Sequence, residues 1–329
     1  MSRALVTGAS GFIGRRLVAR LLEGASVLRA LVRAPETVES WSDRVEVVAG
    51  DVRDPDRVRA AVADVETVFH LAATVHDLRG IRKGEHWEVT VEGTRNVLDA
   101  AQAAGVKRLV FVSSLAVYGE PSVAQRDESE PHSPRSAYGR AKATAERLVL
   151  TLGQTSGIHV SCLRPALVYG PGCKGNLPRM IAMIDRGLFP PPPEVGTRRS
   201  LVHVENLVDA VLLAATHWAA SGRDYIVADR RAYSTRELYD IIRQALGKPA
   251  SRWAVPRGVL TAFGQVGDLV GAVRGRSPGF DSDVVEKLFQ PAWFSADRIA
   301  RELGFDPRWE LVHALPEMIA QSRSRRRDA

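Results

Sequence analysis

The stretch ALVTGASGFIGRRLVARLL, residues 4–22, decides the fold, because it changes from one apolar period to another across a glycine-rich turn. Residues 3–7 predict a strand, and residues 12–22 place apolar side chains on one face of a helix. The turn between them holds three glycines, Gly8, Gly11 and Gly14. At a helix N-terminus, free N–H groups and the helix dipole favour an anion, and glycine lets that anion approach the backbone closely. The G-x-x-G-x-x-G spacing alone also fits a plain turn, so the segments that follow have to decide.

Four more strand patterns follow, at residues 27–32, 45–52, 65–73 and 106–114, with helical patterns between them. Strands that alternate with helices predict an α/β fold with a doubly wound parallel sheet, covered on both faces. Ligands bind such a sheet beyond the carboxyl ends of its strands. Five residues are predicted at those ends: Gly8, Arg33, Asp51, Ala72 and Ser114. This alignment favours a phosphate-binding turn over a plain one.

Composition indicates an ordinary soluble globular protein, with 45% hydrophobic and 25% charged residues in 329. No apolar run has the length of a membrane span and no signal peptide is recognised, so we expect a cytoplasmic protein. Cys162 and Cys173 show neither a disulfide framework nor metal-ligand spacing. Three histidines, His70, His203 and His217, do not share ligand spacing either, so no metal site is expected.

The net charge of +7 raises the question of nucleic acid. Much of that charge lies in residues 322–329, which we expect to be a disordered basic tail. The remaining charge is scattered, without a basic stripe interleaved with aromatic residues. A nucleic-acid partner is therefore not expected, and a small-molecule substrate is.

Two segments, SSLAVYG (residues 113–119) and YGRAK (residues 138–142), indicate the chemistry. The Y-x-x-x-K spacing puts Tyr138 and Lys142 on one helix face, where an ammonium group would lower the phenol pKa from about 10. Tyr138 could then exchange a proton with an alcohol or carbonyl, while the Ser114 hydroxyl bonds the same oxygen. The alternative is a surface helix pair. The upstream serine and the glycine turn favour the catalytic interpretation, which suits hydride chemistry.

The chain resembles the extended short-chain dehydrogenases/reductases, in the NAD-dependent epimerase/dehydratase family that acts on nucleotide sugars. The motifs that carry the resemblance are TGASGFIG (7–14), GDVRD (50–54), HLAA (70–73), VSSLAVYG (112–119), YGRAK (138–142), LRPALVYGPG (163–172) and RSLVHVENLVDAV (199–211). The resemblance implies a Rossmann-type cofactor domain over residues 1–163. Residues 164–329 would form mainly a smaller substrate-binding region, with segments that return to the first sheet.

The resemblance also implies roles for single residues. Ser114, Tyr138 and Lys142 would be the catalytic triad, and the cofactor site would comprise Gly8, Gly11, Phe12, Ile13, Gly14, Arg33, Asp51, Val52, Leu71, Ala72, Ala73, Tyr138, Lys142 and Pro165. Ser114 and Tyr138 would also touch the substrate, and Arg199 would bind its diphosphate. Thr90 replaces an asparagine of many relatives, and Leu167 replaces an asparagine found in one branch of sugar 4-epimerases. Asn176 is the candidate substitute for the diphosphate contact that Leu167 cannot make.

The activity implied is an NAD(P)-dependent reaction at C4 of a nucleotide-diphosphate sugar, as a UDP-hexose 4-epimerase or a 4-ketoreductase of polysaccharide biosynthesis. The alternative within enzymes is an NADP-dependent reductase or dehydrogenase of a non-sugar carbonyl or a sterol-like alcohol. An alternative of another class is a catalytically inactive, cofactor-sensing scaffold.

Cofactor choice and assembly are the last two expectations. The second strand ends at Val32 and Arg33 without the carboxylate that would bind the ribose 2′-hydroxyl of NAD, so NADP is favoured over NAD. Family members commonly dimerise through a four-helix bundle, and we expect a homodimer through the helices near residues 91–104 and 138–152. Residues 255–275 are expected to cover the substrate cleft rather than to touch a membrane.

Overall fold

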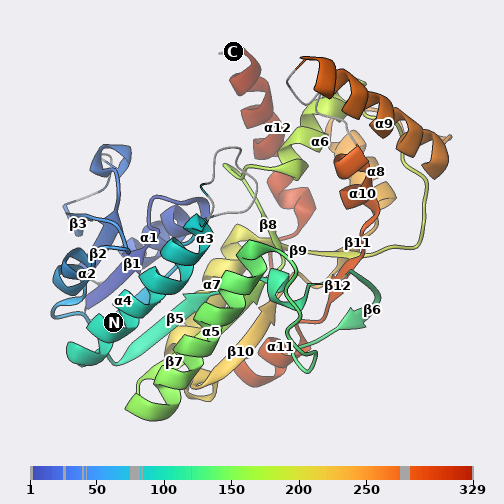
Figure 1. Cartoon of the computed structure of the whole chain (residues 1–329). Helices are drawn as coiled ribbons and strands as arrows, with labels where there is room; N and C mark the ends of the chain where they lie inside the picture. Colours follow the sequence, from blue (N-terminus) through green and yellow to red (C-terminus); the bar gives the residue numbers. More distant parts are fainter. Residues whose placement is uncertain are drawn as a thin grey trace.

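A parallel sheet forms the first layer of the computed structural model, which describes residues 3–24, 27–38, 41, 43–74, 82, 84–119, 121–274 and 282–327. Its strands are β1 (Arg3–Thr7), β2 (Val27–Val32), β3 (Val45–Ala49), β4 (Thr67–His70), β5 (Arg108–Val112), β7 (His159–Pro165) and β10 (Arg223–Val227). They lie in the order β10-β7-β5-β4-β1-β2-β3 (Figure 1), and every pairing is parallel. The predicted doubly wound α/β sheet is confirmed, with the strand order reversing beside β1.

Helices cover both faces of this sheet. One face carries α2 (Pro55–Val62), α4 (Gly93–Ala103) and α5 (Ala137–Ser156), which pack side by side (Figure 1). The other carries α1 (Phe12–Glu23) and α7 (Val204–Thr216). Local sequence fixes their starts: the Asp54 carboxylate accepts from the first turn of α2, and Ser136 Oγ accepts from Gly139 N at 2.9 Å in α5.

A second, smaller sheet lies beside the first. It runs β11 (Ala232–Tyr233), β9 (Arg199–His203), β12 (Ala292–Phe294) and β6 (Ser122–Arg126), and β8 (Leu167–Tyr169) also pairs with β9. Its helical neighbours in Figure 1 are α6 (Asn176–Asp185), α8 (Thr235–Ala245), α9 (Arg257–Arg274), α10 (Ser282–Phe289) and α12 (Leu311–Arg327). The remaining elements are α3 (Glu85–Trp87), α11 (Asp297–Leu303), three 3₁₀ turns at Pro35–Val38, Leu115–Tyr118 and Trp218–Ala220, and a π-helical turn at Glu88–Glu92.

The two parts are interwoven along the chain. The expected boundary between residues 163 and 164 falls inside β7, and β10, from the second half, completes the first sheet as its edge strand. The helices α7 and α11 of the second half also pack onto that sheet. The second half therefore contributes both to the first sheet and to the smaller one.

The expectation of a disordered tail over residues 322–329 is wrong as far as Arg327, because α12 continues to that residue. Leu311, Leu315 and Ile319 are buried and anchor the helix to the cluster formed with α6 and α8. Arg323 then pairs with Asp185 of α6, with Nη2 and Oδ1 2.9 Å apart. Residues 328 and 329 lie outside the described residues.

The segment expected to cover the substrate cleft, residues 255–275, is mostly the helix α9, and residue 275 lies outside the described residues. Leu260 of α9 packs with Val285 and Phe289 of α10. Within the described ranges, no helix combines the length and the apolar character that crossing a bilayer requires.

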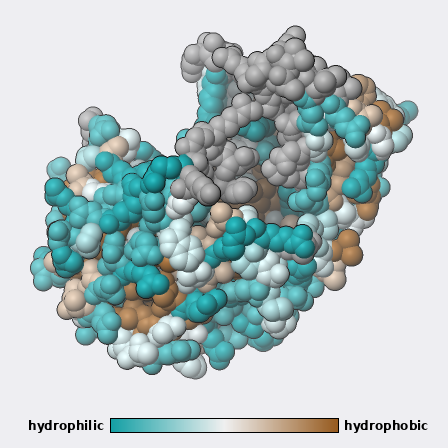
Figure 2. All heavy atoms as spheres, viewed as in Figure 1, coloured by the Kyte–Doolittle hydropathy of each residue, from teal (hydrophilic) through white to brown (hydrophobic). Residues whose placement is uncertain are grey.

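The helices expected at a dimer interface, α4 and α5, lie next to each other. In Figure 2, apolar atoms come to the surface among hydrophilic ones in the region of these two helices. Leu148 and Leu150 of α5 are only partly buried. The homodimer stays a prediction.

Candidate active site

The glycine turn after β1 is a close-packed corner. Gly8 has a φ of +69°, and a Cβ there would lie 2.8 Å from the backbone nitrogen of Ala72. A Cβ on Gly14 would lie 2.3 Å from the Gly8 carbonyl oxygen. The α1 helix begins after Gly11 with no side-chain cap on its first turn. Strand, turn and helix therefore approach more closely than a side chain allows, and the helix N-terminus keeps donors for an anion.

The other predicted cofactor residues lie around the same end of the sheet. Phe12 and Ile13 open α1, and Leu71, Ala72 and Ala73 follow β4; all five are partly buried, whereas Val52 and Pro165 are buried. Asp51 is held by Arg53, with Nη2 and Oδ2 2.9 Å apart, and this pairing lowers the Asp51 pKa. Arg33 is exposed, and its positive charge also lowers the Asp51 pKa.

A buried polar chain under this corner was not predicted from the sequence. The hydroxyl of Thr7 lies 2.7 Å from His70 Nδ1, and His70 Nε2 lies 3.0 Å from the Thr94 hydroxyl. The amide of Ala72 donates to Thr7 Oγ1 at 3.2 Å. Burial lowers the His70 pKa to about 3, so the ring is neutral. These bonds fix the ends of β1 and β4 against α4, and sequence analysis had placed His70 only as a packing or strand-end residue.

Thr90, which replaces an asparagine of many relatives, lies in the turn that precedes α4. Thr90 lies buried in the π-helical turn Glu88–Glu92, and its hydroxyl has no hydrogen-bond partner among the described residues. Thr94 Oγ1 donates to the Thr90 carbonyl one turn later. The Thr90 carbonyl therefore accepts a hydrogen bond, while the Thr90 hydroxyl makes no polar contact in the part of the chain described.

The predicted triad comes together between β5 and α5. The side chain of Ser114 hydrogen-bonds Tyr138, and Ser114 Oγ also accepts from Ala116 N at 3.2 Å. Lys142 is 2% exposed and donates from Nζ to the Val112 carbonyl at 2.6 Å. Its Nζ also lies 4.6 Å from the centre of the Phe111 ring. The structure thus brings all three side chains to the carboxyl end of β5.

The direction in which the Tyr138 pKa is shifted differs from the expectation. Burial raises the pKa of Tyr138, and the hydrogen bond from Ser114 opposes that rise only in part. The lowered phenol pKa predicted from a nearby ammonium group is therefore wrong for this structure, because desolvation outweighs the opposing effects. Burial also lowers the Lys142 pKa to about 7, against the influence of the Glu146 carboxylate.

A pocket of about 230 Å³ lies beside the segment that follows Ser114 in the chain, and none of the three triad residues is among those that line it. Leu115 and Ala116, directly after Ser114, form one wall, and β6, β9 and the segment Gln290–Phe294 form the others. Arg199 and Arg126 both line it. The Arg199 guanidinium donates to the Gln290 carbonyl at 2.9 Å, and burial lowers the Arg199 pKa.

Asn176, the other predicted substrate residue, does not line this pocket. It is exposed at the first position of α6. Leu167, whose place in the resemblance prompted that expectation, is 48% exposed on β8. Among the described residues, no group of three or more histidine, cysteine, aspartate or glutamate side chains is placed to hold a metal ion.

Fold and site together define a nucleotide-cofactor enzyme of the extended short-chain dehydrogenase/reductase type. The model of the NAD-dependent epimerase/dehydratase family matches residues 4–228, and the chain belongs to this family. It is 30% identical over 343 residues to a 3β-hydroxysteroid dehydrogenase/Δ5→4-isomerase of Mycobacterium tuberculosis, covering 97% of this chain and 90% of that protein. It is also 30% identical over 310 residues to a UDP-glucose 4-epimerase of Vibrio cholerae, covering 92% and 90%. The structure of a dTDP-glucose 4,6-dehydratase from Streptomyces venezuelae with bound NAD superposes with a TM-score of 0.76, at 25% identity and 98% coverage of both chains.

Proposed function

We propose that this enzyme acts at C4 of a nucleotide-diphosphate sugar, as a 4-epimerase or a 4-ketoreductase. The observation that carries the proposal is the pocket beside Ser114, which contains Arg199 and Arg126. Arg199 is partly buried, and a diphosphate suits the fork of donors of a guanidinium. Arg126 lines the same pocket and adds a second positive charge that an anionic group could meet.

The cofactor site fits a nicotinamide dinucleotide. The glycine corner brings the start of α1 close to the ends of β1 and β4, and that helix start offers uncapped donors to a diphosphate. Asp51 and Val52 would lie at the adenine, and Lys142 and Pro165 at the nicotinamide end. When bound, the nicotinamide supplies or accepts a hydride.

The residues of the chain handle the proton. Because burial raises the Tyr138 pKa, the phenol keeps its proton at neutral pH and can donate it to a carbonyl oxygen. Ser114, already bonded to Tyr138, would orient that same oxygen. In the reverse direction Tyr138 must lose the proton, and the positive charge of Lys142 would favour the phenolate.

Cofactor preference is proposed as NADP over NAD. Arg33 stands exposed just beyond β2, where Val32 is buried and no carboxylate takes the acceptor position. Arg15, near the start of α1, reaches the segment that follows β2, because its Nη2 donates to the Thr37 carbonyl at 2.5 Å. The Arg16 side chain instead points to α7, with its Nε 3.8 Å from Glu205 Oε1, so we assign Arg16 no role at a 2′-phosphate.

The test of the sugar proposal is incubation with NAD(H) or NADP(H) and UDP-hexoses, with C4 epimers and 4-keto sugars as products. Arg199→Gln should weaken UDP binding by at least about tenfold, because a charged hydrogen-bond partner is lost. Arg198→Gln is the matched control, since the neighbouring Arg198 pairs with Glu237 at 3.2 Å and is outside the pocket. Absence of both UDP binding and turnover would reject the nucleotide-sugar proposal.

A second candidate substrate is a sterol-like alcohol, and the similarity to a 3β-hydroxysteroid dehydrogenase over 97% of the chain favours it. The exposed Leu167 is compatible with an apolar substrate. Turnover of a 3β-hydroxysteroid, unaffected by Arg199→Gln, would select this candidate. In both cases Tyr138→Phe should abolish turnover yet retain cofactor binding; full activity in that variant would contradict the catalytic assignment and favour neither substrate.

A further inference from the structure

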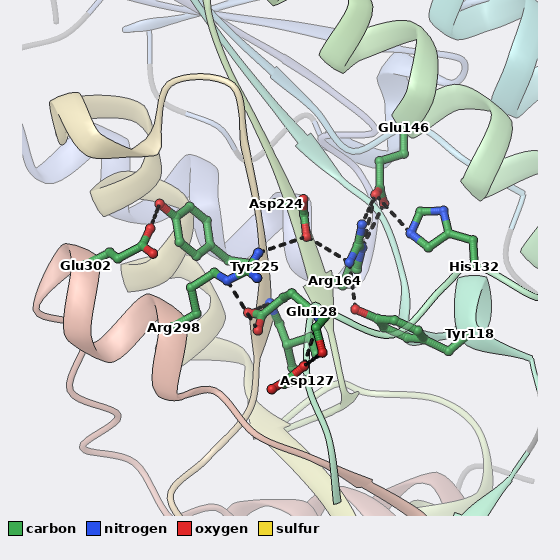
Figure 3. Close-up of polar contacts among 12 residues, drawn as sticks. Tyr118, Asp127, Glu128, His132, Glu146, Arg164, Asp224, Tyr225, Arg298 and Glu302 are labelled. Carbon is green, nitrogen blue, oxygen red and sulfur yellow. Dashed lines mark hydrogen bonds and ion pairs between the residues drawn. The ribbon is translucent and has the colours of Figure 1, made fainter.

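A cluster of charged side chains lies beside α5, and Glu146 of that helix points toward Arg164 within it (Figure 3). At its centre is Arg164 of β7, which is 3% exposed. Its Nε lies 3.0 and 3.2 Å from the two carboxylate oxygens of Glu146, and Nη2 makes a further bond to Oε1. Nη1 donates to the Tyr118 hydroxyl at 2.6 Å and faces Asp224 at 2.8 Å. Arg164 thereby fixes the position of the Glu146 carboxylate.

Glu146 is fully buried and stands four residues after Lys142, so the two side chains share one face of α5. The cluster continues to Arg298, which lies 3.6 Å from Asp224 and 3.7 Å from Glu128. Besides Glu146, the cluster contains the carboxylates of Asp127, Glu128 and Asp224, and its guanidinium groups are those of Arg164 and Arg298 (Figure 3).

We propose that Glu146 is a positioning residue for the catalytic lysine, holding Lys142 in its charged form while Arg164 fixes the Glu146 carboxylate. This rests on the proposed role of Lys142 beside Tyr138 and on neither substrate in particular. Two observations support it. Both side chains are buried one helical turn apart on α5, and among the described residues the Glu146 carboxylate has the largest favourable effect on the charged form of Lys142. The Val112 carbonyl binds Lys142 Nζ but carries no net charge.

Four other titratable groups lie near the pair: His70, His132, Cys162 and Tyr138. His70 of β4 lies within the field of Lys142, but its lowered pKa keeps it neutral. His132 approaches Glu146, with Nε2 and Oε1 3.5 Å apart, and burial lowers the His132 pKa. Burial raises the pKa of Cys162, whose Sγ lies 4.0 Å from the Glu146 carbonyl, so this thiol stays neutral. Tyr138 keeps its proton for the same reason. Among these groups, Glu146 is the one whose carboxylate favours the Lys142 ammonium.

The experiment is a pH titration of Lys142 in the full chain without cofactor or substrate, followed by NMR of ¹³Cε-labelled lysine. The chain has six lysines, and Lys142→Arg assigns the signal. We expect a wild-type midpoint near neutral pH, and a decrease of at least about one pH unit in Glu146→Gln. Glu146→Asp, which keeps the charge, should stay closer to the wild type. Glu302→Gln is the matched control, because Glu302 accepts from the Tyr225 hydroxyl at 2.9 Å on the far side of the cluster.

An unchanged midpoint in folded Glu146→Gln would overturn the proposal. Since that variant leaves Arg164 buried without its partner, a double variant, Glu146→Gln with Arg164→Gln, removes both charges. It is expected to show a smaller decrease than Glu146→Gln, because loss of the nearby guanidinium favours the Lys142 ammonium. A wild-type midpoint far below pH 7 would contradict the proposal without any variant. The titration needs no substrate, so rejection of the nucleotide-sugar proposal would leave this result unaffected.

Discussion

Replacing Gly14 by alanine tests whether the glycine corner is the cofactor cradle. The added methyl would lie 2.3 Å from the Gly8 carbonyl oxygen and 2.8 Å from Ala9 Cα, both backbone atoms. Ordinary contact requires α1 and the turn to separate by roughly 1 Å. Such overpacking costs about 3 kcal/mol where backbone has to move, and better helix propensity returns about 1 kcal/mol. The expected net loss of stability is about 2 kcal/mol.

The assays are urea unfolding and a fluorescence titration with NADH and NADPH. A displacement of this size at the start of α1 should weaken binding of either cofactor by about 100-fold, even under conditions where the protein is folded. Gly24→Ala is the control, because a Cβ there would meet its nearest atom, the Leu21 carbonyl oxygen, at an ordinary 3.5 Å. If Gly14→Ala binds cofactor and resists urea like the wild type, the corner is not the cradle.

Three further predictions follow from the structure. Arg33→Ala should reduce the ratio of NADPH to NADH affinity in binding titrations; an unchanged ratio would remove Arg33 from cofactor selection. Native His70, with its pKa lowered to about 3, binds no proton over the range in which an unfolded histidine does, from about pH 6.5 downward, so stability should fall as pH falls through that range. His70→Asn should make this decline shallower in urea unfolding between about pH 7 and pH 4, and an identical slope would contradict the assignment. Light scattering should give about twice 35.9 kDa for the predicted homodimer, whereas a monomer at micromolar concentration would exclude it.

Hydrophobic period and turn chemistry were enough to predict five of the seven strands of the first sheet; β7 and β10 were not among them. Each of the five lies inside its predicted range or matches it, but three are shorter, such as β3 at Val45–Ala49 against residues 45–52. The apolar pattern continues past the point where pairing ends, because residues such as Val52 are buried in the loops that form the site. The apolar period of the sequence indicates which residues are buried. At these strand ends, residues stay buried beyond the last residue that pairs with a neighbouring strand.

Long-range pairing could not be predicted in the same way. The strand β6 is short and mostly exposed, and its partner β12 lies more than 160 residues later, so no local pattern placed Arg126 beside Arg199. The pKa of Tyr138 also depended on tertiary burial, which outweighs the local Y-x-x-x-K spacing. The basic end of the chain looked solvated by composition, yet the buried apolar residues of α12 carry the helix into it.

The strand order of the smaller sheet has a consequence for the growing chain on the ribosome. The last strand of the larger sheet is complete at Val227, whereas β12 inserts between β9 and β6 only after Phe294 has been synthesised. Until then β6 has no strand partner, and the wall that carries Gln290–Phe294 is missing from the pocket. Because domains fold as their chain emerges, all seven strands of the larger sheet are available well before the substrate pocket, although α11 packs onto that sheet only later. A polypeptide released early would thus carry every strand of the larger sheet and no complete substrate pocket.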